Sequence, residues 1–308
     1  MGCDQTEGLP LAGSCAILLC VADIVIPSAW ASLGEKSLVG TVMVIGASDT
    51  GKSTLARHLY LALCRQGRRA AYLDTDLGQS TLGVPTTLNL ALSSEPHDER
   101  FPPQDVQLTY FVGATTPRGH MLPTVIGAHR LQQRALALGA DAIVVDTSGL
   151  VDPADGGKAL KQWKIELLAP SVVIGLQRRR ELEPILWPLR RDGRVRCVEL
   201  PVSPMVVARS REARIAHRRE LLSRTFEGAP SQRVALHRMA VYDLERLTAG
   251  GLLAFQDGDG FALGLGVVEE VDRSGGTALV RTPLASLEGV RSVRLGTTRW
   301  DLGGRQEM

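Results

Sequence analysis

The chain has 308 residues, of which 44% are hydrophobic and 22% charged, and its formal net charge is +2. This length accommodates one large α/β domain and a smaller second domain, and the charge balance excludes a polycation that binds its partners through overall charge alone. The cysteines show neither metal-ligand spacing nor a paired disulfide framework, so we expect a reducing, cytoplasmic environment; they are Cys3, Cys15, Cys20, Cys64 and Cys197.

Residues 1–38 are expected to form an N-terminal strand segment. The apolar run at residues 15–26 is interrupted by Asp23 and is too short to span a bilayer, so we interpret it as one or two strands. The residues before it lack the positive charge and the apolar stretch of a secretory signal. We therefore expect no targeting segment and no membrane partner.

A glycine-rich motif, G-x-x-x-x-G-K-S, follows an apolar, β-branched run at residues 41–45. Residues 55–65 after it are good helix formers with apolar positions on one side. In this strand–turn–helix context the motif binds the phosphates of a nucleoside triphosphate. Lys52 is expected to reach the β- and γ-phosphates, and the Ser53 hydroxyl is expected to bind Mg²⁺. The expected nucleotide-binding residues are Gly46, Ala47, Ser48, Asp49, Thr50, Gly51, Lys52, Ser53 and Thr54.

Strand and helix signals alternate up to residue 200, which predicts an α/β fold of the P-loop NTPase type with a central parallel sheet over residues 39–227. The carboxyl ends of parallel strands share one edge of a sheet. Loops at residues 74–80, 113–120 and 146–149 should therefore converge on the glycine-rich motif. Further strands are expected at residues 70–74, 106–112, 142–145, 171–176 and 195–200, and helices at residues 125–138, 159–168 and 181–189.

The pattern changes in the last third of the chain. Residues 201–226 are rich in arginine and are expected to form a helix with Arg211, Arg214 and Arg218 on one face and Arg209 at its start, capped by Ser210. Such a run is often only a solvated helix face, but its place after the last core strand is also that of a lid over transferring phosphates. Residues 228–308 are expected to form a small β domain, with strands at residues 252–255, 261–268, 277–280 and 290–295.

Three acids follow expected core strands and are candidates for the metal site: Asp74, Asp76 and Asp146. Mg²⁺ binding requires a carboxylate near the phosphates. Two acids two residues apart can divide the work, one holding the metal and the other taking a proton from an attacking hydroxyl. The run at residues 146–149 also fits the D-x-x-G of GTPases, but Gln177 and the three arginines after it replace the guanine-specific motif.

Aromatic side chains are only 4% of the chain, which does not favour extended base stacking as a binding mode. Trp30, Trp163 and Trp187 are interpreted as packing residues.

Together these motifs resemble the polynucleotide 5′-hydroxyl kinase family, over roughly residues 22–226. The segment L-D-T-D-L-G-Q-S at residues 73–80 is similar to the family's D-x-D-x-G-Q signature, and residues 110–117 are similar to its G-x-T-T-P loop. The glycine-rich motif, the D-T-S-G run, Trp30 and the Arg209–Arg214 pair also have counterparts in the family. The resemblance implies an enzyme that transfers the γ-phosphoryl group of ATP, with Mg²⁺, to the 5′-hydroxyl of RNA or DNA.

The resemblance also implies roles for individual residues. Asp76 is the expected base and metal-shell residue, with Asp74 and Asp146 as supporting acids and Ser53 as a metal ligand. Lys52, Arg209 and Arg214 are expected to neutralise phosphate charge. The residues expected to orient the substrate end are Gln79, Thr115 and Thr116.

This chain departs from the family at one substrate-binding position and in length. Leu150 stands where several eukaryotic members carry a tryptophan that helps to hold the substrate, and we expect no counterpart of their long N-terminal domain. The compact form looks more like archaeal or bacterial members. Two alternatives stay open from the sequence: a non-catalytic, ATP-bound scaffold in an RNA-processing complex, and a related P-loop ATPase or GTPase switch.

Overall fold

The computed structural model describes residues 26–34, 38–93, 100–103 and 106–300. The strands expected within residues 15–26 lie outside this part of the chain, apart from Ile26. The first described element is a helix, α1 (Ser28–Gly34), which the sequence analysis did not expect within the N-terminal strand segment. The helix begins after Pro27, whose carbonyl oxygen accepts the backbone N–H groups of Trp30 and Ala31, and the buried Trp30 side chain anchors it.

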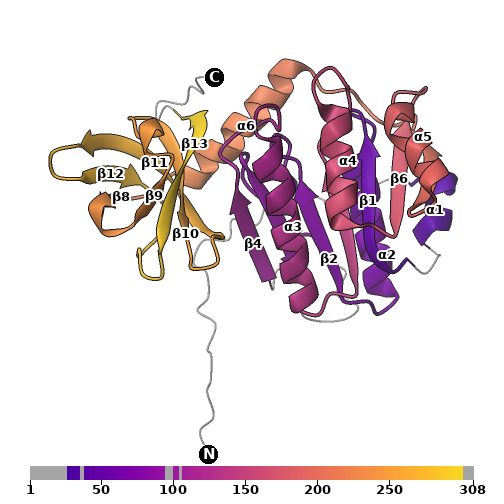
Figure 1. The fold of residues 1–308 in the computed structure, drawn as a ribbon, viewed down its shortest axis with the longest axis horizontal. Coiled ribbons are helices and arrows are strands. Elements are labelled where there is room, and N and C mark those ends of the chain that lie inside the picture. Colours follow the sequence, from indigo (N-terminus) through magenta and orange to yellow (C-terminus); the bar gives the residue numbers. More distant parts are fainter. Residues whose placement is uncertain (1–25, 35–37, 94–99, 104–105, 301–308) are drawn as a thin grey trace, which may run out of the picture.

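Five parallel strands form the centre of the larger sheet, in the order β2-β5-β1-β6-β7. This confirms the expected P-loop architecture with its central parallel sheet (Figure 1). Most of the side chains of the four inner strands are fully buried, as the near-continuous apolar runs in the sequence predicted. The strands are β1 (Gly40–Gly46), β2 (Ala70–Thr75), β5 (Ala142–Thr147), β6 (Val172–Gln177) and β7 (Arg196–Pro201).

Two more strands extend this sheet beyond β2, and one of them was not expected. The unexpected strand β3 (Thr87–Leu92) is antiparallel both to β2 and to β4 (Val106–Phe111). Two successive reversals leave β4 pointing in the same direction as the parallel strands. The loop after β4 therefore still reaches the edge of the sheet where the glycine-rich motif lies.

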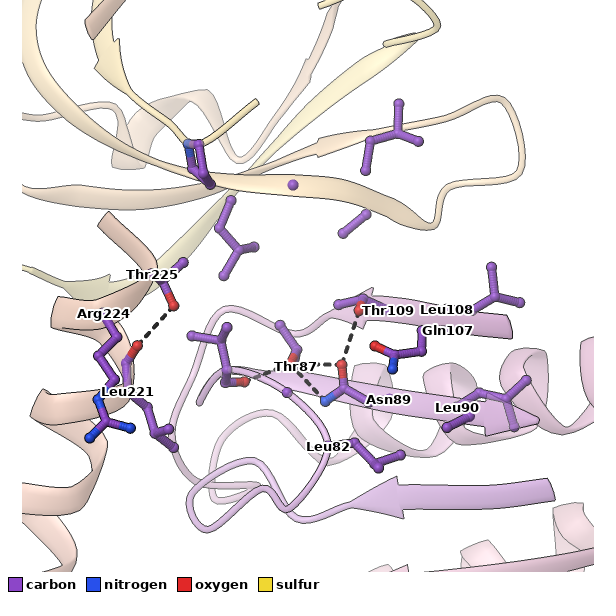
Figure 2. Close-up of a pocket in the computed structure, with 18 residues that line it drawn as sticks. Leu82, Thr87, Asn89, Leu90, Gln107, Leu108, Thr109, Leu221, Arg224 and Thr225 are labelled. Atoms are coloured by element: carbon purple, nitrogen blue, oxygen red, sulfur yellow. Dashed lines mark hydrogen bonds between the residues drawn. The ribbon is translucent and has the colours of Figure 1, made fainter. Parts of the chain in front are cut away.

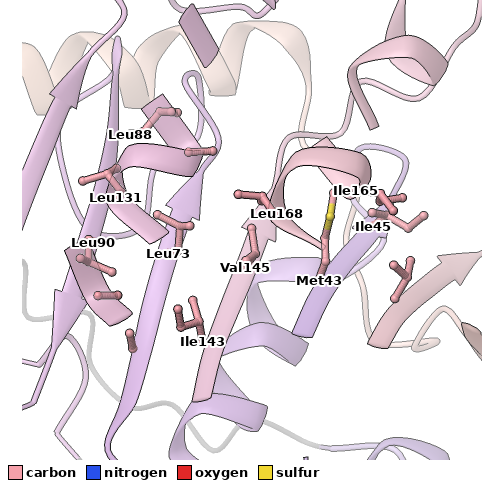
Figure 3. Close-up of a cluster of buried hydrophobic side chains, with 14 of the residues drawn as sticks. Met43, Ile45, Leu73, Leu88, Leu90, Leu131, Ile143, Val145, Ile165 and Leu168 are labelled. Carbon is pink, nitrogen blue, oxygen red and sulfur yellow. The ribbon is translucent and has the colours of Figure 1, made fainter. Parts of the chain in front are cut away.

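Helices cover both faces of the sheet, and alternation along the strands divides the core in two. Figure 3 shows part of one of these two clusters, with Met43 and Ile45 among its members. Met43 and Ile45 of β1 face the layer of α3, α4 and α5, whereas Val42 and Val44 face α1 and α2. Each fully buried aliphatic side chain contributes about 1.5–3 kcal/mol of hydrophobic stabilisation. The helices are α2 (Lys52–Arg65), α3 (Met121–Ala137), α4 (Gly157–Leu168) and α5 (Glu183–Asp192).

Helix α6 (Arg211–Phe226) leads into a second, six-stranded sheet with the order β8-β12-β11-β10-β13-β9. The four strands expected in this small β domain are confirmed, whereas β8 and β9 were not expected. Two short 3₁₀ turns, at Leu236–Arg238 and Leu244–Arg246, flank β9. The strands are β8 (Ser231–Ala235), β9 (Ala240–Tyr242), β10 (Gly251–Gln256), β11 (Ala262–Asp272), β12 (Thr277–Arg281) and β13 (Ser292–Arg299).

The second sheet contacts the loop that follows β4. The backbone N–H groups of Thr297 and Thr298 donate to the carbonyl oxygen of Gly113 at 2.8 and 3.0 Å. Gly113 has a φ of +79°, and a Cβ atom added to it would lie 2.4 Å from Cα of Gly296. Phe111, Leu222 and Phe226 add an apolar cluster with buried side chains of the second sheet. The second sheet is therefore fixed to a loop at the edge of the first.

Two described tryptophans do not pack in the core. The side chains of Trp163 and Trp187 are 66% and 54% exposed, so their assignment as packing residues was wrong, whereas Trp30 is buried. The guanidinium group of Arg191 lies 4.8 Å from the ring centre of Trp187. Among the residues that the structure describes, no helix is long and apolar enough to cross a bilayer.

The close approach at Gly113 predicts a large effect of a single methyl group. Gly113→Ala should lower the free energy of unfolding by about 3 kcal/mol, because a left-handed backbone costs an alanine about 1–2 kcal/mol and overpacking adds about 1–3 kcal/mol. Gly119 is the matched control, since it also has a positive φ but has no atom within 4 Å of an added Cβ. Urea unfolding of both variants measures the difference, and equal effects would show that the contact with Gly296 is not tight.

Candidate functional site

The glycine-rich motif forms a phosphate loop between β1 and α2. Gly51, directly before the helix, has a φ of +87°, and an added Cβ would lie 3.0 Å from the ring of Trp30. Asp49 also has a positive φ, of +54°. The Lys52 ammonium group donates to the carbonyl oxygen of Ala47 at 2.7 Å, inside the loop. Burial lowers the pKa of Lys52, although the nearby carboxylates of Asp146 and Asp76 oppose this effect.

A cavity of about 1070 Å³ opens over this loop. It brings together residues from all the loops that the sequence predicted to converge, and Leu150 lies on its wall. Of the residues expected to act on a substrate or on phosphate, those that line the cavity are Lys52, Ser53, Asp76, Gln79, Thr115, Thr116, Arg209 and Arg214.

Of the three candidate acids for the metal site, Asp76 is the one that lines this cavity. Its Oδ1 atom accepts the backbone N–H groups of Gly78 and Gln79 at 2.9 and 3.0 Å, so the carboxylate is held at the start of a tight turn. The backbone N–H of Asp76 in turn donates to Oδ1 of Asp74 at 3.0 Å. The turn therefore fixes the carboxylate on the cavity wall, on the same cavity as Lys52.

Asp74 has a structural role that the sequence did not predict. Its side chain is buried, and Oδ2 accepts from the Ser80 hydroxyl at 2.7 Å and from the backbone N–H groups of Thr81 and Leu82 at 2.6 and 3.2 Å. Asp74 does not line the cavity over the phosphate loop. Its hydrogen bonds hold the turn that carries Asp76, and this use of both oxygens disfavours the expected metal-binding role.

Asp146 lies beneath the phosphate loop at the end of β5. The Tyr72 hydroxyl donates to its Oδ2 at 3.1 Å, and its Oδ1 is buried without a hydrogen-bond partner among the described residues. Burial raises the pKa of Asp146 to about 7, and the neighbouring Asp74 adds to this effect, while Lys52 opposes it. A buried carboxylate oxygen of this kind is suited to a ligand that carries positive charge.

Two buried lysines on α4 balance these acids, and sequence analysis did not identify them. The Lys161 ammonium group donates to the backbone carbonyl oxygen of Ser148 at 2.6 Å, and so it holds the turn after Asp146. Burial lowers the pKa of Lys164 to about 8, and the carboxylates of Asp76, Asp74 and Asp146 oppose this effect. The sequence did carry a signal for their burial. Both lysines lie on the same face of α4 as Leu160 and Leu168, and these leucines mark the apolar side of the helix.

The arginine-rich helix covers the other side of the cavity. Ser210 caps α6 as predicted, with its Oγ accepting the backbone N–H of Ala213 at 3.1 Å. The Arg214 guanidinium group forms an ion pair with Asp49 of the phosphate loop, and the backbone N–H of Arg209 donates to the same carboxylate at 3.3 Å. The lid helix is thus attached to the phosphate loop in this structure.

Other cavity residues connect the lid with the Asp76 turn. Nε2 of Gln79 donates to the carbonyl oxygen of Gly78 at 2.7 Å and lies 3.5 Å from that of Arg214. The backbone oxygen of Thr115 lies against Gly78, where an added Cβ would come within 2.8 Å of it. Arg178 also contacts the phosphate loop through the carbonyl oxygens of Ser48 and Asp49. Sequence analysis had noted Arg178 only because it stands where a GTPase would carry its guanine-binding motif.

The residues present fit a magnesium ion bound together with nucleotide phosphates. The Ser53 hydroxyl lies on the cavity wall, and Asp146 offers the unpartnered oxygen below it. The described part of the chain holds no cluster of three His, Cys, Asp or Glu side chains suited to a metal ion. Mg²⁺ at phosphotransfer sites commonly takes only one or two carboxylates and completes its shell with phosphate and water.

The fold and the site define a P-loop nucleotide-binding protein with an acidic group beside the phosphate loop. Residues 46–228 match the family model of the mRNA cleavage and polyadenylation factor CLP1 P-loop, and the chain belongs to that family.

This chain is similar to two archaeal proteins over longer stretches than the family model covers. The polyribonucleotide 5′-hydroxyl-kinase of Methanocaldococcus jannaschii is 25% identical over 86% of this chain and 88% of the relative. That of Pyrococcus horikoshii is 32% identical over 70% of this chain, and the match spans about half of the relative (55%). A chain in the structure of a wild-type Clp1p–Pcf11p (454–563) complex has the same fold, with a TM-score of 0.65 over 88% of this chain and 77% of the other, at 14% identity.

Asp74 and Asp76 are expected to respond differently to the same substitution. Asp74→Asn should lower the free energy of unfolding by about 2–3 kcal/mol, because an amide nitrogen then faces backbone and hydroxyl donors in a buried place. Asp76→Asn keeps the one oxygen that accepts the two backbone N–H groups and should cost under about 1 kcal/mol. Thermal and urea unfolding compare the two variants, and a larger loss in Asp76→Asn would contradict the division of roles.

Proposed function

We propose that this chain is an ATP-dependent polynucleotide 5′-hydroxyl kinase that phosphorylates RNA. The observation that carries the proposal is the placement of the Asp76 carboxylate on the same cavity as Lys52 and the phosphate loop. A cavity of about 1070 Å³ has room for a triphosphate and for the end of a second substrate. The names of the archaeal relatives, polyribonucleotide 5′-hydroxyl-kinases, support both the reaction and the RNA acceptor.

The donor end of the reaction belongs to the phosphate loop. Backbone N–H groups at the start of α2 and the partial positive charge of that helix end favour phosphate oxygens. The Lys52 ammonium group, which bonds the Ala47 carbonyl oxygen in this structure, would turn to the β- and γ-phosphates when ATP binds. Ser53 and Asp146 would hold Mg²⁺ there, and the ion would neutralise charge on the β- and γ-phosphate oxygens.

The acceptor end belongs to Asp76. Its carboxylate would accept the proton of the 5′-hydroxyl while the 5′ oxygen forms a bond to the γ-phosphorus and the bond between that phosphorus and the β-γ bridging oxygen breaks. ADP and a 5′-phosphorylated strand are the products. The transition state of phosphoryl transfer is loose, so positioning and charge stabilisation supply most of the rate, and a general base adds about 10²–10⁴-fold.

Arg214 is placed to respond to the donor. Its guanidinium group is paired with Asp49 on the phosphate loop, and both Arg209 and Arg214 line the cavity. A bound γ-phosphate carries more negative charge than one carboxylate and lies beside the same loop. We infer that Arg214 exchanges Asp49 for phosphate oxygens during the reaction, which gives the transferring group a bidentate partner.

Incubation with γ-labelled ATP and a 5′-hydroxyl oligoribonucleotide tests the function. The wild-type chain should label the RNA, and Asp76→Asn should bind ATP with unchanged affinity but lose about 10²–10⁴-fold in kcat, because the proton acceptor is gone. Asp259→Asn changes an exposed acid outside the cavity and serves as the matched control.

Two results would contradict the proposal at different levels. ATP binding without any labelled RNA or DNA would favour the non-catalytic scaffold over the kinase. Normal transfer by Asp76→Asn would leave the kinase intact but would remove Asp76 from the role of base.

A further inference from the structure

A second cavity, of about 310 Å³, lies between the two sheets (Figure 2). Its floor is formed by β3 and β4, its side by α6, and its roof by the strands of the C-terminal domain. Figure 2 shows Gln107 and Thr109 on the floor and Thr225 on the helix side. None of the roles proposed so far uses this cavity.

The floor of the cavity carries a built polar network. Asn89 is only 5% exposed, and its Oδ1 accepts from the Thr109 hydroxyl at 3.0 Å while its Nδ2 donates to Thr87 at 3.0 Å. Beside it, Nε2 of Gln107 donates to the carbonyl oxygen of Pro103 at 3.1 Å. The side-chain oxygen of Gln107 and the Thr109 hydroxyl thus offer hydrogen-bonding groups to the cavity from a fixed surface.

The opposite wall is aliphatic, and a cation stands at the rim. Leu263, Leu265 and Pro283 contribute apolar surface from the C-terminal domain. Arg224 also lines the cavity; its side chain is half exposed, and its guanidinium group forms an ion pair with Glu220 one turn earlier on α6. A polar floor, an aliphatic wall and one cation match parts of a nucleotide: the hydrogen-bonding edge of a base, an apolar face of that base and a phosphate.

Two segments of the chain line both this second cavity and the cavity over the phosphate loop, which we call the first cavity. The segment after β2 contributes Gln79 and Thr81 to the first cavity and then Leu82 and Val84 to the second. Along α6, Arg214 lines the first cavity and Leu221 the second. Seven helical residues span about 10 Å, which is about three steps of a stacked strand at roughly 3.4 Å for each nucleotide.

We propose that the second cavity is an acceptor-strand subsite, which takes a nucleoside about three positions from the 5′ end of a single-stranded RNA. This inference rests on the proposed kinase function, because the 5′ end is placed at Asp76. The base turns its hydrogen-bonding edge toward Gln107 and Thr109 on the floor and packs against the aliphatic wall, and the phosphate beside it replaces Glu220 as the partner of Arg224. The subsite supplies a grip on the strand in a chain that has Leu150, and not an aromatic residue, directly after the turn at residues 146–149.

A length series of acceptors tests the subsite. KM for 5′-hydroxyl oligoribonucleotides of two to six residues is measured at saturating ATP and constant salt. The wild-type chain should show a fall in KM of about tenfold or more between two and four nucleotides, since a base held against a protein surface contributes on this scale, and little change beyond that length.

Two substitutions with matched controls locate the effect. Gln107→Trp fills the cavity and should abolish the gain on longer acceptors while leaving dinucleotide phosphorylation unchanged, whereas Gln133→Trp, at an exposed position of α3, should keep the gain. Arg224→Ala should reduce the fall in KM on longer acceptors by about threefold. Arg219→Ala, at an exposed position of the same helix, should leave that fall in KM unchanged. Arg224 is half exposed, so its variant decides the question if Gln107→Trp fails to fold.

The outcomes separate the subsite from the function. If no acceptor is phosphorylated by the wild-type chain, the kinase proposal itself fails. If dinucleotides are phosphorylated but longer acceptors show no lower KM, or if Gln107→Trp and Arg224→Ala keep the full gain, the subsite is overturned and the kinase stands.

Discussion

The site depends on a balance of buried charge beneath the phosphate loop. Asp74 and Asp146 are both buried next to Asp76, and an uncompensated buried ion costs several kcal/mol. Lys52 and Lys164 are buried beside these acids, and the carboxylates favour the charged forms of both lysines. Burial lowers the pKa of Lys161 well below its usual range, and this lysine holds the Ser148 turn through its hydrogen bond. If α2 or α4 shifted while these groups stayed buried, an acid would lose its opposite charge at this cost. This requirement holds the phosphate loop, the Asp76 turn and the Ser148 turn in one arrangement.

The C-terminal domain extends this arrangement toward a second substrate. The Gly113 carbonyl oxygen accepts hydrogen bonds from Thr297 and Thr298, and two residues later Thr115 lines the first cavity. The same domain roofs the second cavity, and α6 runs from one cavity to the other. A strand lying along this route would contact both domains, so that a fixed junction between the domains would also fix the path of the strand.

Most of the fold and the centre of the site were predictable from local signals. The phosphate loop was clear because its spacing coincides with a buried strand and a helix, and the converging loops followed from the direction of parallel strands. Strand β3 was missed although Leu88, Leu90 and Leu92 alternate along it, because Asn89 and Ala91 are poor strand formers and Thr87 is its one β-branched residue. Strand β9 was missed because it is three residues long.

The features that the sequence did not predict arise from contacts that only the folded chain defines. Asp74 has the sequence position of a metal ligand, but its oxygens accept hydrogen bonds from residues 80–82, which no spacing rule specifies. Lys161 and Lys164 appear in the sequence as ordinary helix residues, yet both are fully buried. Trp163 and Trp187 are of a residue type that usually packs in a core, but their side chains are exposed to solvent.

The most direct measurement of the central claim is a crystal structure with a non-hydrolysable ATP analogue and a 5′-hydroxyl tetranucleotide. We predict the 5′ oxygen within about 3.2 Å of an Asp76 carboxylate oxygen; a 5′ end bound away from Asp76, with the triphosphate on the phosphate loop, would contradict the account.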